Sequence, residues 1–471
     1  MSDALPRSRP RIAPGPGGRS IEAPRLGKAG HDARGTGRDA RDTGRDAAHG
    51  RTPARQKATA LVRERHQADY AILVIVIALT AIGILVVYSS SAIKAYIATD
   101  DSLSVVGPQI AWAGLGLVAM ILMMRVDYRY LRYASVAGIV VAIGALVLLL
   151  VLPTTGPVRA VSVGGSARWL QVGPLPAVHP AEIAKLAMIV YLAHWLARRG
   201  SRVKSFWGGT IPFLVIVGPI VALVFKEPDL GTTMVIGLTA VTMFFLAGGS
   251  LIHLLAIGGA AFVALVGVGL RAYQLTRIRT WLDPWSDPLG AGFHTIQGLL
   301  ALGLGGLLGA GLGESRLAGG LFLPNASNDY IFAIIGEEFG LVGAGVVIVL
   351  FVGLAYSGIR VSLAAPDTFG ALLAAGITAW LCIQAFINIG VVVALIPVTG
   401  ITLPFISAGG SSLTISLAAV GILLSISRET VERGTWNDAA ADRRGRDGRA
   451  YLPGTGRGPR APRTTRSPER A

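Results

Sequence analysis

Ten long apolar segments constrain the fold of this chain more than any other feature. At a rise of about 1.5 Å per residue, each is long enough as a helix to cross the roughly 30 Å of hydrocarbon in a bilayer. We therefore expect an all-α polytopic membrane protein with about ten transmembrane helices, and 52% hydrophobic residues among 471 exclude a soluble protein. The segments lie near 70–90, 105–124, 134–152, 178–197, 210–225, 229–248, 251–271, 331–356, 370–395 and 411–427.

Basic tails flank this core and carry most of the net charge of +16. Residues 1–68 contribute +8 and residues 428–471 contribute +5, so the charge does not indicate nucleic-acid binding. Both tails are too polar to bury enough apolar surface to fold, so we expect disordered basic cytoplasmic arms at 1–68 and 429–471 around a core at 69–428. Such arms suit anionic lipid heads or a cytoplasmic partner, or serve only as solubilising tails.

The orientation follows from Lys and Arg in the short loops, which mark the cytoplasmic side. Both termini are therefore expected in the cytoplasm, and the loops after the third, seventh and ninth segments face outward. Cys382, the only cysteine, lies in an apolar segment, which excludes a disulfide framework and a thiolate metal site. The basic residues follow the second, fourth, eighth and tenth segments: Arg125, Arg129, Arg132, Arg198, Arg199, Arg202, Lys204, Arg360 and Arg428.

The large outward loop at 272–330 is far longer than ordinary connections, and such loops are usually functional or disordered. Trp281 and Trp285 are expected to anchor it at the membrane interface. Its glycine-rich apolar stretch at 292–310 predicts an interfacial or re-entrant helix, in which glycines at spacing four (Gly305, Gly309 and Gly313) permit close packing. At its end, Asp329 directly precedes an apolar run and would meet the membrane surface.

Ionisable residues also occur inside or beside the apolar segments. Glu337 and Glu338 lie within the apolar segment that follows Asp329, and the side chain of at least one is expected to point into a polar cavity. Glu182 and Lys185 are three residues apart and are expected to pair on one helix face. Lys226 precedes a turn in which Pro228 and Asp229 suit the start of the next helix.

Two further outward segments offer groups for an anionic ligand. Arg168 and Trp169 place a cation beside an aromatic surface, although a headgroup anchor and an interfacial tryptophan are the simpler interpretation. After the ninth segment, Pro and Gly break the helix, and backbone N–H groups at the next helix start commonly bind anions. The polar or small residues of this region are Asn388, Thr399, Ser407, Gly409, Gly410 and Ser411.

Six motifs follow one another along the chain: ARW, HPAEIAK, EPDLGTT, WLDPWSDPLGAG, LPNASNDYIFAIIGEE and IPVTGITLPFISAGGSS. In this order they resemble the SEDS family (shape, elongation, division and sporulation), which includes FtsW and RodA. The resemblance covers about residues 70–428, and the ISAGG form, the LPN form and the outer YSSSAIKAY segment are most similar to FtsW of actinobacteria. Asn325, Ser327 and Asn328 depart from the common LPEAHT pattern, and Ala408 stands where many members have Tyr.

The resemblance implies a peptidoglycan glycosyltransferase that polymerises lipid II for septal wall synthesis in cell division. It implies an inverting displacement with Asp329 as general base. The leaving diphosphate calls for cations, for which Arg168, Lys185 and Lys226 are the outward candidates, with or without a divalent ion such as Mg²⁺ or Mn²⁺. The remaining substrate-contact candidates are Trp169, Glu182, Asn388, Thr399, Ser407, Gly409, Gly410 and Ser411.

The resemblance also implies partners and a location. The partners are lipid II, a class B penicillin-binding protein (FtsI-like), other divisome proteins and membrane lipid, and the location is the bacterial plasma membrane at the division septum. Two alternatives stay open. A lipid II flippase would require polar residues at mid-membrane and an internal repeat, and no repeat is visible. An elongation-type polymerase like RodA would share the same chemistry.

Overall fold

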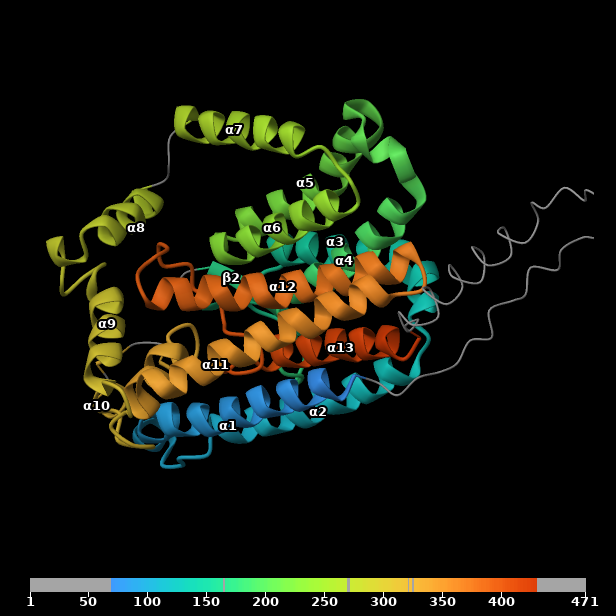
Figure 1. The fold of residues 1–471 in the computed structure, drawn as a ribbon. Helices are drawn as coiled ribbons and strands as arrows, with labels where there is room; N and C mark the ends of the chain where they lie inside the picture. The colour runs from blue at the N-terminus through green and yellow to red at the C-terminus, as the bar shows by residue number, and fades with distance from the viewer. Residues whose placement is uncertain (1–68, 164–165, 269–271, 321, 324–325, 430–471) are drawn as a thin grey trace, which may run out of the picture. The chain divides into compact units, whose positions relative to one another are not determined.

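The structure is a computed structural model that describes residues 69–163, 166–268, 272–320, 322–323 and 326–429. The arms predicted at 1–68 and beyond Glu429 lie outside the described residues, as does Asn325. Helices occupy all ten predicted apolar segments (Figure 1): α1 (Tyr70–Thr99), α2 (Val106–Arg125), α3 (Leu131–Val151), α4 (Pro180–Arg199), α5 (Ile211–Lys226), α6 (Leu230–Leu246), α7 (Leu251–Val268), α11 (Ile331–Ala364), α12 (Thr368–Val392) and α13 (Gly410–Ser427).

Seven helices of the described chain are long and apolar enough to cross a membrane, namely α1, α2, α3, α5, α11, α12 and α13, where α3 and α5 are counted with the short turns before them. Among the others, α4 carries Glu182 and Lys185, and α6 has only 17 residues. The short turns are η1 (Tyr128–Tyr130), η2 (Gly200–Lys204) and η3 (Phe206–Thr210). The prediction of a mostly helical, multi-pass protein is confirmed.

Small residues allow the helices to pack closely. A Cβ at Gly116 of α2 would lie 2.5 Å from a methyl of Leu417 on α13, and a Cβ at Gly421 would lie 2.4 Å from the carbonyl oxygen of Met120. Side chains of α12 form the buried centre of the bundle, where Trp380 and Leu373 are fully buried. Because lipid is as apolar as these side chains, close backbone approach rather than burial from water holds such helices together.

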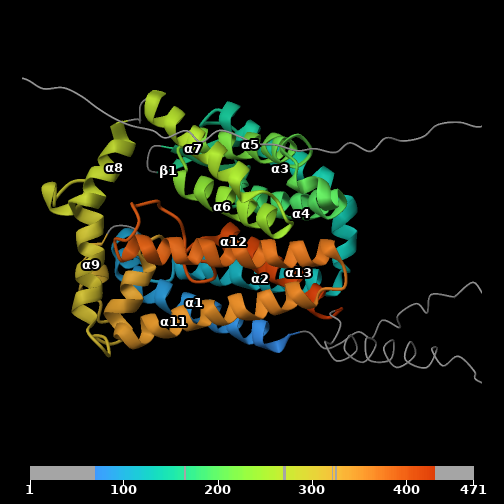
Figure 2. The same ribbon diagram turned by 45° about the horizontal axis from the view of Figure 1, so that its top comes forward.

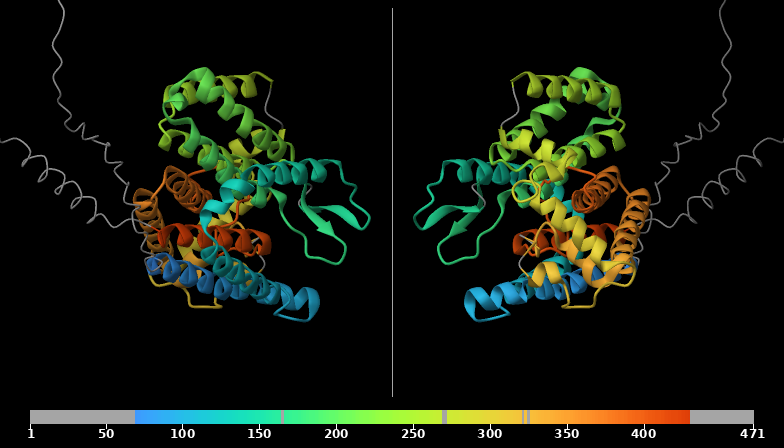
Figure 3. Two further views of the ribbon diagram at one scale, coloured as in Figure 1. Left: turned by 90° about the vertical axis from the view of Figure 1, so that its right-hand side faces the viewer. Right: turned by 90° about the vertical axis from the view of Figure 1, so that its left-hand side faces the viewer.

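A β-hairpin follows α3, and the sequence analysis did not predict it. It consists of β1 (Val158–Val163) and β2 (Ser166–Val172), paired antiparallel. Leu170 and Val178 exchange two backbone hydrogen bonds of 2.8 and 2.9 Å, which join the hairpin to the start of α4. Figure 3 shows the hairpin projecting to one side of the helices.

The large loop contains α8 (Ala272–Leu282), η4 (Pro284–Ser286), α9 (Phe293–Gly305) and α10 (Arg316–Gly319). Helices α8 and α9 lie at the same end of α11 and α12 (Figures 1 and 2). Helix α9 confirms a helix within 292–310 but ends at Gly305, so the three glycines at spacing four do not all lie on it. Gly309 and Gly313 lie beyond it with φ of 88° and 83°. Close approach is retained, since a Cβ at Gly309 would lie 2.1 Å from the carbonyl oxygen of Glu338.

Helix α11 breaks at Gly340, whose φ of 66° is in the left-handed region. The loop after α9 pairs with this break: Ala310 and Gly311 donate to the carbonyls of Glu337 and Glu338 at 2.9 and 3.0 Å. The side chain of Glu337 accepts hydrogen bonds from the Ser315 hydroxyl (2.5 Å) and from two backbone N–H groups, those of Arg316 (2.8 Å) and Leu317 (3.3 Å).

The carboxylate of Glu338 accepts hydrogen bonds from the Ser89 hydroxyl on α1 and the backbone N–H of Gly313. The expectation that Glu337 or Glu338 points into a polar cavity is therefore wrong. The reason is local: the backbone N–H groups of Gly313, Arg316 and Leu317, in the loop and at the start of α10, have no helical partners, and these two buried carboxylates accept from them. Both glutamates hold the loop against α1 and α11.

Candidate active site

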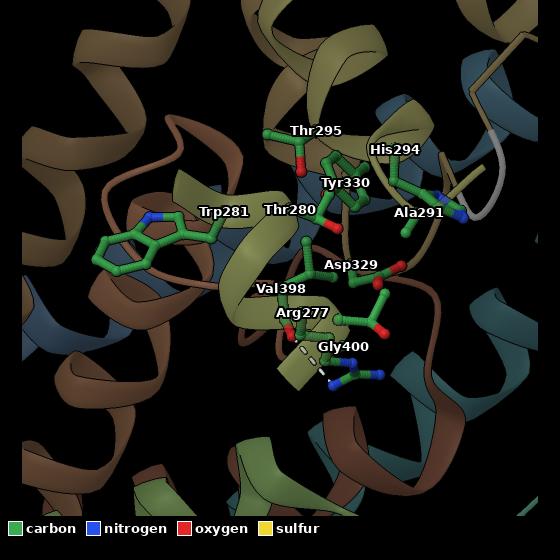
Figure 4. Close-up of a pocket in the computed structure, with 11 residues that line it drawn as sticks. Arg277, Thr280, Trp281, Ala291, His294, Thr295, Asp329, Tyr330, Val398 and Gly400 are labelled. Carbon is green, nitrogen blue, oxygen red and sulfur yellow. Dashed lines mark hydrogen bonds between the residues drawn. The ribbon is translucent and has the colours of Figure 1, made fainter. Parts of the chain in front are cut away.

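A cavity of about 430 Å³ lies where α8, α9 and the segment before α11 meet the connection between α12 and α13. Figure 4 shows its side chains gathered around Asp329. The cavity contains one carboxylate, one guanidinium and one imidazole, with threonine hydroxyls and aromatic rings between them. The lining residues are Thr276, Arg277, Thr280, Trp281, Ala291, His294, Thr295, Asp329, Tyr330, Val398 and Gly400.

The backbone of Asp329 is fixed by α12 and the connection after it. The side-chain amide of Asn388 donates to the carbonyl oxygens of Asp329 (2.8 Å) and Ile401 (2.7 Å). The hydroxyl of Ser407 donates to the carbonyl oxygen of Asn328 at 2.6 Å. These bonds hold the peptide units on both sides of the Asp329 Cα. Asn388 and Ser407 are therefore adjacent to the predicted base, as supports of its backbone.

The Asp329 carboxylate itself has an unusual environment. Burial raises its pKa from 3.8 to about 6, and the nearby Arg277 guanidinium and a backbone hydrogen bond offset only part of that effect. Gly400 leaves room beside it, because even a Cβ at this position would lie 3.9 Å from the carboxylate. Asp329 is therefore ionised at neutral pH yet more basic than a solvated aspartate.

Helix α8 brings Arg277 and Trp281 into the cavity, four residues apart on one helix face. Arg277 donates to the carbonyl oxygen of Val398 at 3.0 Å, and the indole N–H of Trp281 donates to that of Ala394 at 2.9 Å. Arg277 is not predicted from the sequence, and Trp281 is expected there only as an interface anchor. Their spacing of four in a short amphipathic stretch was the available signal.

Helix α9 contributes His294, which the sequence analysis also missed. Its imidazole stacks on the ring of Tyr330, with centroids 5.9 Å apart and planes at 28°. Burial lowers the pKa of His294, so its ring is neutral at pH 7.

Arg168 and Trp169 lie in a separate polar cluster, outside the lining of this cavity. The Arg168 guanidinium donates to the backbone carbonyls of Glu227 (3.3 Å) and Pro228 (2.7 Å), and so ties β2 to the turn between α5 and α6. The Trp169 ring meets His179 edge-on, with centroids 5.3 Å apart. Because both side chains are engaged in this way, Arg168 and Trp169 do not form an open surface for an anionic ligand.

Glu182 and Lys185 form the expected pair at 2.8 Å within α4. The Lys185 ammonium also donates to Gln384 at 2.7 Å and lies 5.2 Å from the ring centroid of Trp380. Both side chains are buried, so this pair joins α4 to α12 inside the bundle.

The turn between α5 and α6 has the predicted capped form. Asp229 precedes α6, and its carboxylate accepts from the backbone N–H of Thr232 at 3.0 Å. Lys226 is exposed at the end of α5. Burial, with a contribution from Asp229, raises the pKa of Glu227 to about 8.

The glycine and serine residues before α13 are engaged with neighbouring helices. The backbone N–H of Gly409 donates to Gln109 at 3.2 Å, and a Cβ at Gly410 would lie 2.2 Å from the ring of Trp112. The hydroxyl of Ser411 accepts from the backbone N–H of His179 at 3.3 Å. Thr399 lies between the lining residues Val398 and Gly400. A role in substrate binding stays a prediction for Thr399, Gly409, Gly410 and Ser411.

A divalent ion held by side chains does not fit the described cavity. Asp329 and His294 are its only lining residues of the types that commonly ligate metals, and the described part of the chain contains no group of three or more such residues. We therefore derive no step through a metal ion.

Comparison with known proteins identifies the family to which this chain belongs. The family model for FtsW, RodA and SpoVE, described as cell cycle protein, matches residues 70–432. The chain belongs to this family. Stage V sporulation protein E of Bacillus subtilis is 44% identical over 76% of this chain and 97% of its own length. A probable peptidoglycan glycosyltransferase FtsW of Geobacter metallireducens is 40% identical over 78% of this chain and 96% of its own length.

A solved structure of a peptidoglycan synthase complex, in which polymerization and crosslinking are coordinated, contains a similar chain. It is 27% identical with a TM-score of 0.63, and the match covers 78% of this chain and 99% of that one. The predicted membership of the SEDS family, and of its FtsW-like part, is confirmed.

Proposed function

We propose that this chain is a peptidoglycan glycosyltransferase that polymerises lipid II into glycan strands, with Asp329 as its general base. The observation that carries the proposal is the Asp329 carboxylate itself. Hydrogen bonds fix the backbone on both sides of its Cα. Its side chain lines a cavity that also contains Arg277, and its pKa is about 6. A base poised just below neutral pH is ionised in the cell and still accepts a proton in the transition state. The relatives named as FtsW support the reaction class.

In the proposed step, a sugar hydroxyl of one lipid-linked disaccharide attacks C1 of another. The new bond forms between the hydroxyl oxygen and C1 while the bond from C1 to the diphosphate oxygen breaks. The hydroxyl proton passes to the carboxylate of Asp329, and the electron pair leaves with the lipid diphosphate. Attack opposite the leaving group inverts the configuration at C1.

The cation proposed for the leaving diphosphate is Arg277, because it lines the same cavity as the base. Arg168, Lys185 and Lys226 all lie outside the lining of this cavity. Asn388 and Ser407 are proposed as positioning residues, since each holds a carbonyl next to the Asp329 Cα.

The proposed setting is the plasma membrane at the division septum, with both termini in the cytoplasm. Two contacts at one end of the bundle support the orientation. Arg428 donates to the carbonyl of Met124 at 3.3 Å, and Arg129 pairs with Asp367 at 3.4 Å, so basic residues from several helices share that side. A class B penicillin-binding protein (FtsI-like) is the proposed partner, consistent with the similar chain in the synthase complex.

The test is glycan formation from lipid II by the purified chain with a cognate partner that has no glycosyltransferase domain. Native protein and Glu314→Gln, which alters an exposed carboxylate of the same loop, should both form glycan ladders, and Asp329→Asn should form none. Lipid II transfer across vesicles is measured in parallel. Transfer without any glycan would contradict the proposal and favour a flippase. Depletion in cells separates the division role, which predicts filaments without septa, from elongation.

A further inference from the structure

The imidazole of His294 has nothing bound to its ring nitrogens. Within the described residues, neither nitrogen has a hydrogen-bond partner. Arg277 and Trp281, by contrast, donate to backbone carbonyls. His294 lines the same cavity as Asp329 (Figure 4). It therefore offers the cavity an unused donor and an unused acceptor.

The position of the ring is fixed relative to Asp329. Its stacking partner, Tyr330, is the next residue along the chain, and the two rings lie with centroids 5.9 Å apart. Tyr330 is fully buried and packs against α9 at Gly298, where a Cβ would lie 2.8 Å from the tyrosine ring. The contact between α9 and Tyr330 thus couples the imidazole to the segment that carries the carboxylate.

The charge state of His294 suits a neutral ligand. Asp329, Arg277 and Tyr330 are the titratable groups that face the cavity with it. Burial lowers the pKa of His294, so at pH 7 one nitrogen donates and the other accepts. This pair matches a hydroxyl or an acetamido group of a sugar, whereas a diphosphate would require a cation.

We propose that His294 is a second catalytic-site residue, which binds the acceptor sugar through its ring nitrogens and orients the attacking hydroxyl towards Asp329. The inference rests on the proposed function. The acceptor is the assigned ligand because the base that removes the acceptor proton lies in the same cavity.

Two substitutions separate this role from simple packing. His294→Phe keeps a ring on Tyr330 and removes both nitrogens, whereas His294→Gln removes the ring and keeps a donor and an acceptor. We expect the Phe variant to raise KM for lipid II about tenfold, the loss expected for one or two hydrogen bonds, and the Gln variant to stay within about threefold of native. Gln297→Ala, on the same helix but outside the cavity lining, is the matched control.

A pH profile provides an independent readout. At acid pH, log kcat/KM of the native enzyme should reach a limiting slope near two, because both Asp329 and His294 must be deprotonated, and the Gln variant should show a limiting slope near one. A Phe variant with native KM, or a Gln variant that loses activity while Phe keeps it, would overturn the proposal and leave His294 as a packing residue. Failure of Asp329→Asn to abolish polymerisation would instead overturn the proposed function.

Discussion

The side-chain amide of Asn388 donates a hydrogen bond of 2.8 Å to the backbone carbonyl of Asp329. A second hydrogen bond from the same amide, 2.7 Å to Ile401, joins α12, the predicted base and the connection to α13 at one point. Asn388 is nearly inaccessible to solvent, so water cannot replace these bonds when the amide is removed.

We expect Asn388→Leu to lower kcat by about 10- to 100-fold through displacement of Asp329, with little change in KM for lipid II. Thr378→Val on the same helix is the control, because the Thr378 hydroxyl bonds only to the helix carbonyl of Ala374. Steady-state polymerisation by both variants checks the prediction. A native kcat for Asn388→Leu would show that Asp329 holds its position without this amide.

The pKa of Asp329 predicts the acid limit of activity. A general base must be deprotonated, and burial raises the pKa of this carboxyl from 3.8 to about 6. Activity should therefore decrease as the pH falls through about 6, roughly two pH units above the limit set by a solvated aspartate. The initial rate of lipid II polymerisation between pH 4.5 and 8 measures this limit, and full activity at pH 4.5 would contradict it.

The same pKa predicts that Asp329 destabilises the fold at neutral pH. Because its folded pKa is above the unfolded value, the folded chain binds this proton more tightly, and stability is lost as the pH rises from about 4 to 6. Asp329→Asn should therefore raise the free energy of unfolding at pH 7.5 by about 1–3 kcal/mol, and the difference should largely vanish at pH 4. Thermal unfolding in detergent at both pH values provides the measurement. A variant less stable than native at pH 7.5 would contradict the prediction.

The glycines of the large loop should differ sharply in their tolerance of a side chain. A Cβ at Gly309 would lie 2.1 Å from the carbonyl oxygen of Glu338, and its φ is 88°. Gly309→Ala should therefore lower the midpoint of thermal unfolding and abolish activity. Gly303→Ala in α9 has open space around its Cβ and should be neutral or slightly stabilising. Equal effects of the two substitutions would contradict the packing of the loop on α11.

Local sequence information was sufficient for the helices. The ten apolar segments predicted helices because hydrophobicity over about twenty residues is a local property. Asp329 was selected because it directly precedes such a segment, and its role as the base stays a prediction. The β1–β2 hairpin and the break at Gly340 were missed, since the first is short and the second depends on the loop that pairs with it.

The companions of Asp329 could not be predicted from local patterns. Arg277 and His294 belong to α8 and α9, and only the packing of both helices against Tyr330 and the α12–α13 connection brings them to the carboxylate. Arg168 and Lys185 were candidates for the leaving diphosphate, but the structure gives them partners from distant segments, such as the Pro228 carbonyl and Gln384.

Binding and turnover by Asp329→Asn test the central claim most directly. The amide has nearly the shape of the carboxylate but accepts no proton at neutral pH. With fluorescent lipid II, the account predicts an affinity within about threefold of native together with loss of glycan synthesis by at least about a hundredfold, the lower end of the range for a positioned base. An Asn variant that polymerises lipid II at the native rate, or that fails because it no longer binds lipid II, would contradict the assignment of Asp329 as the base.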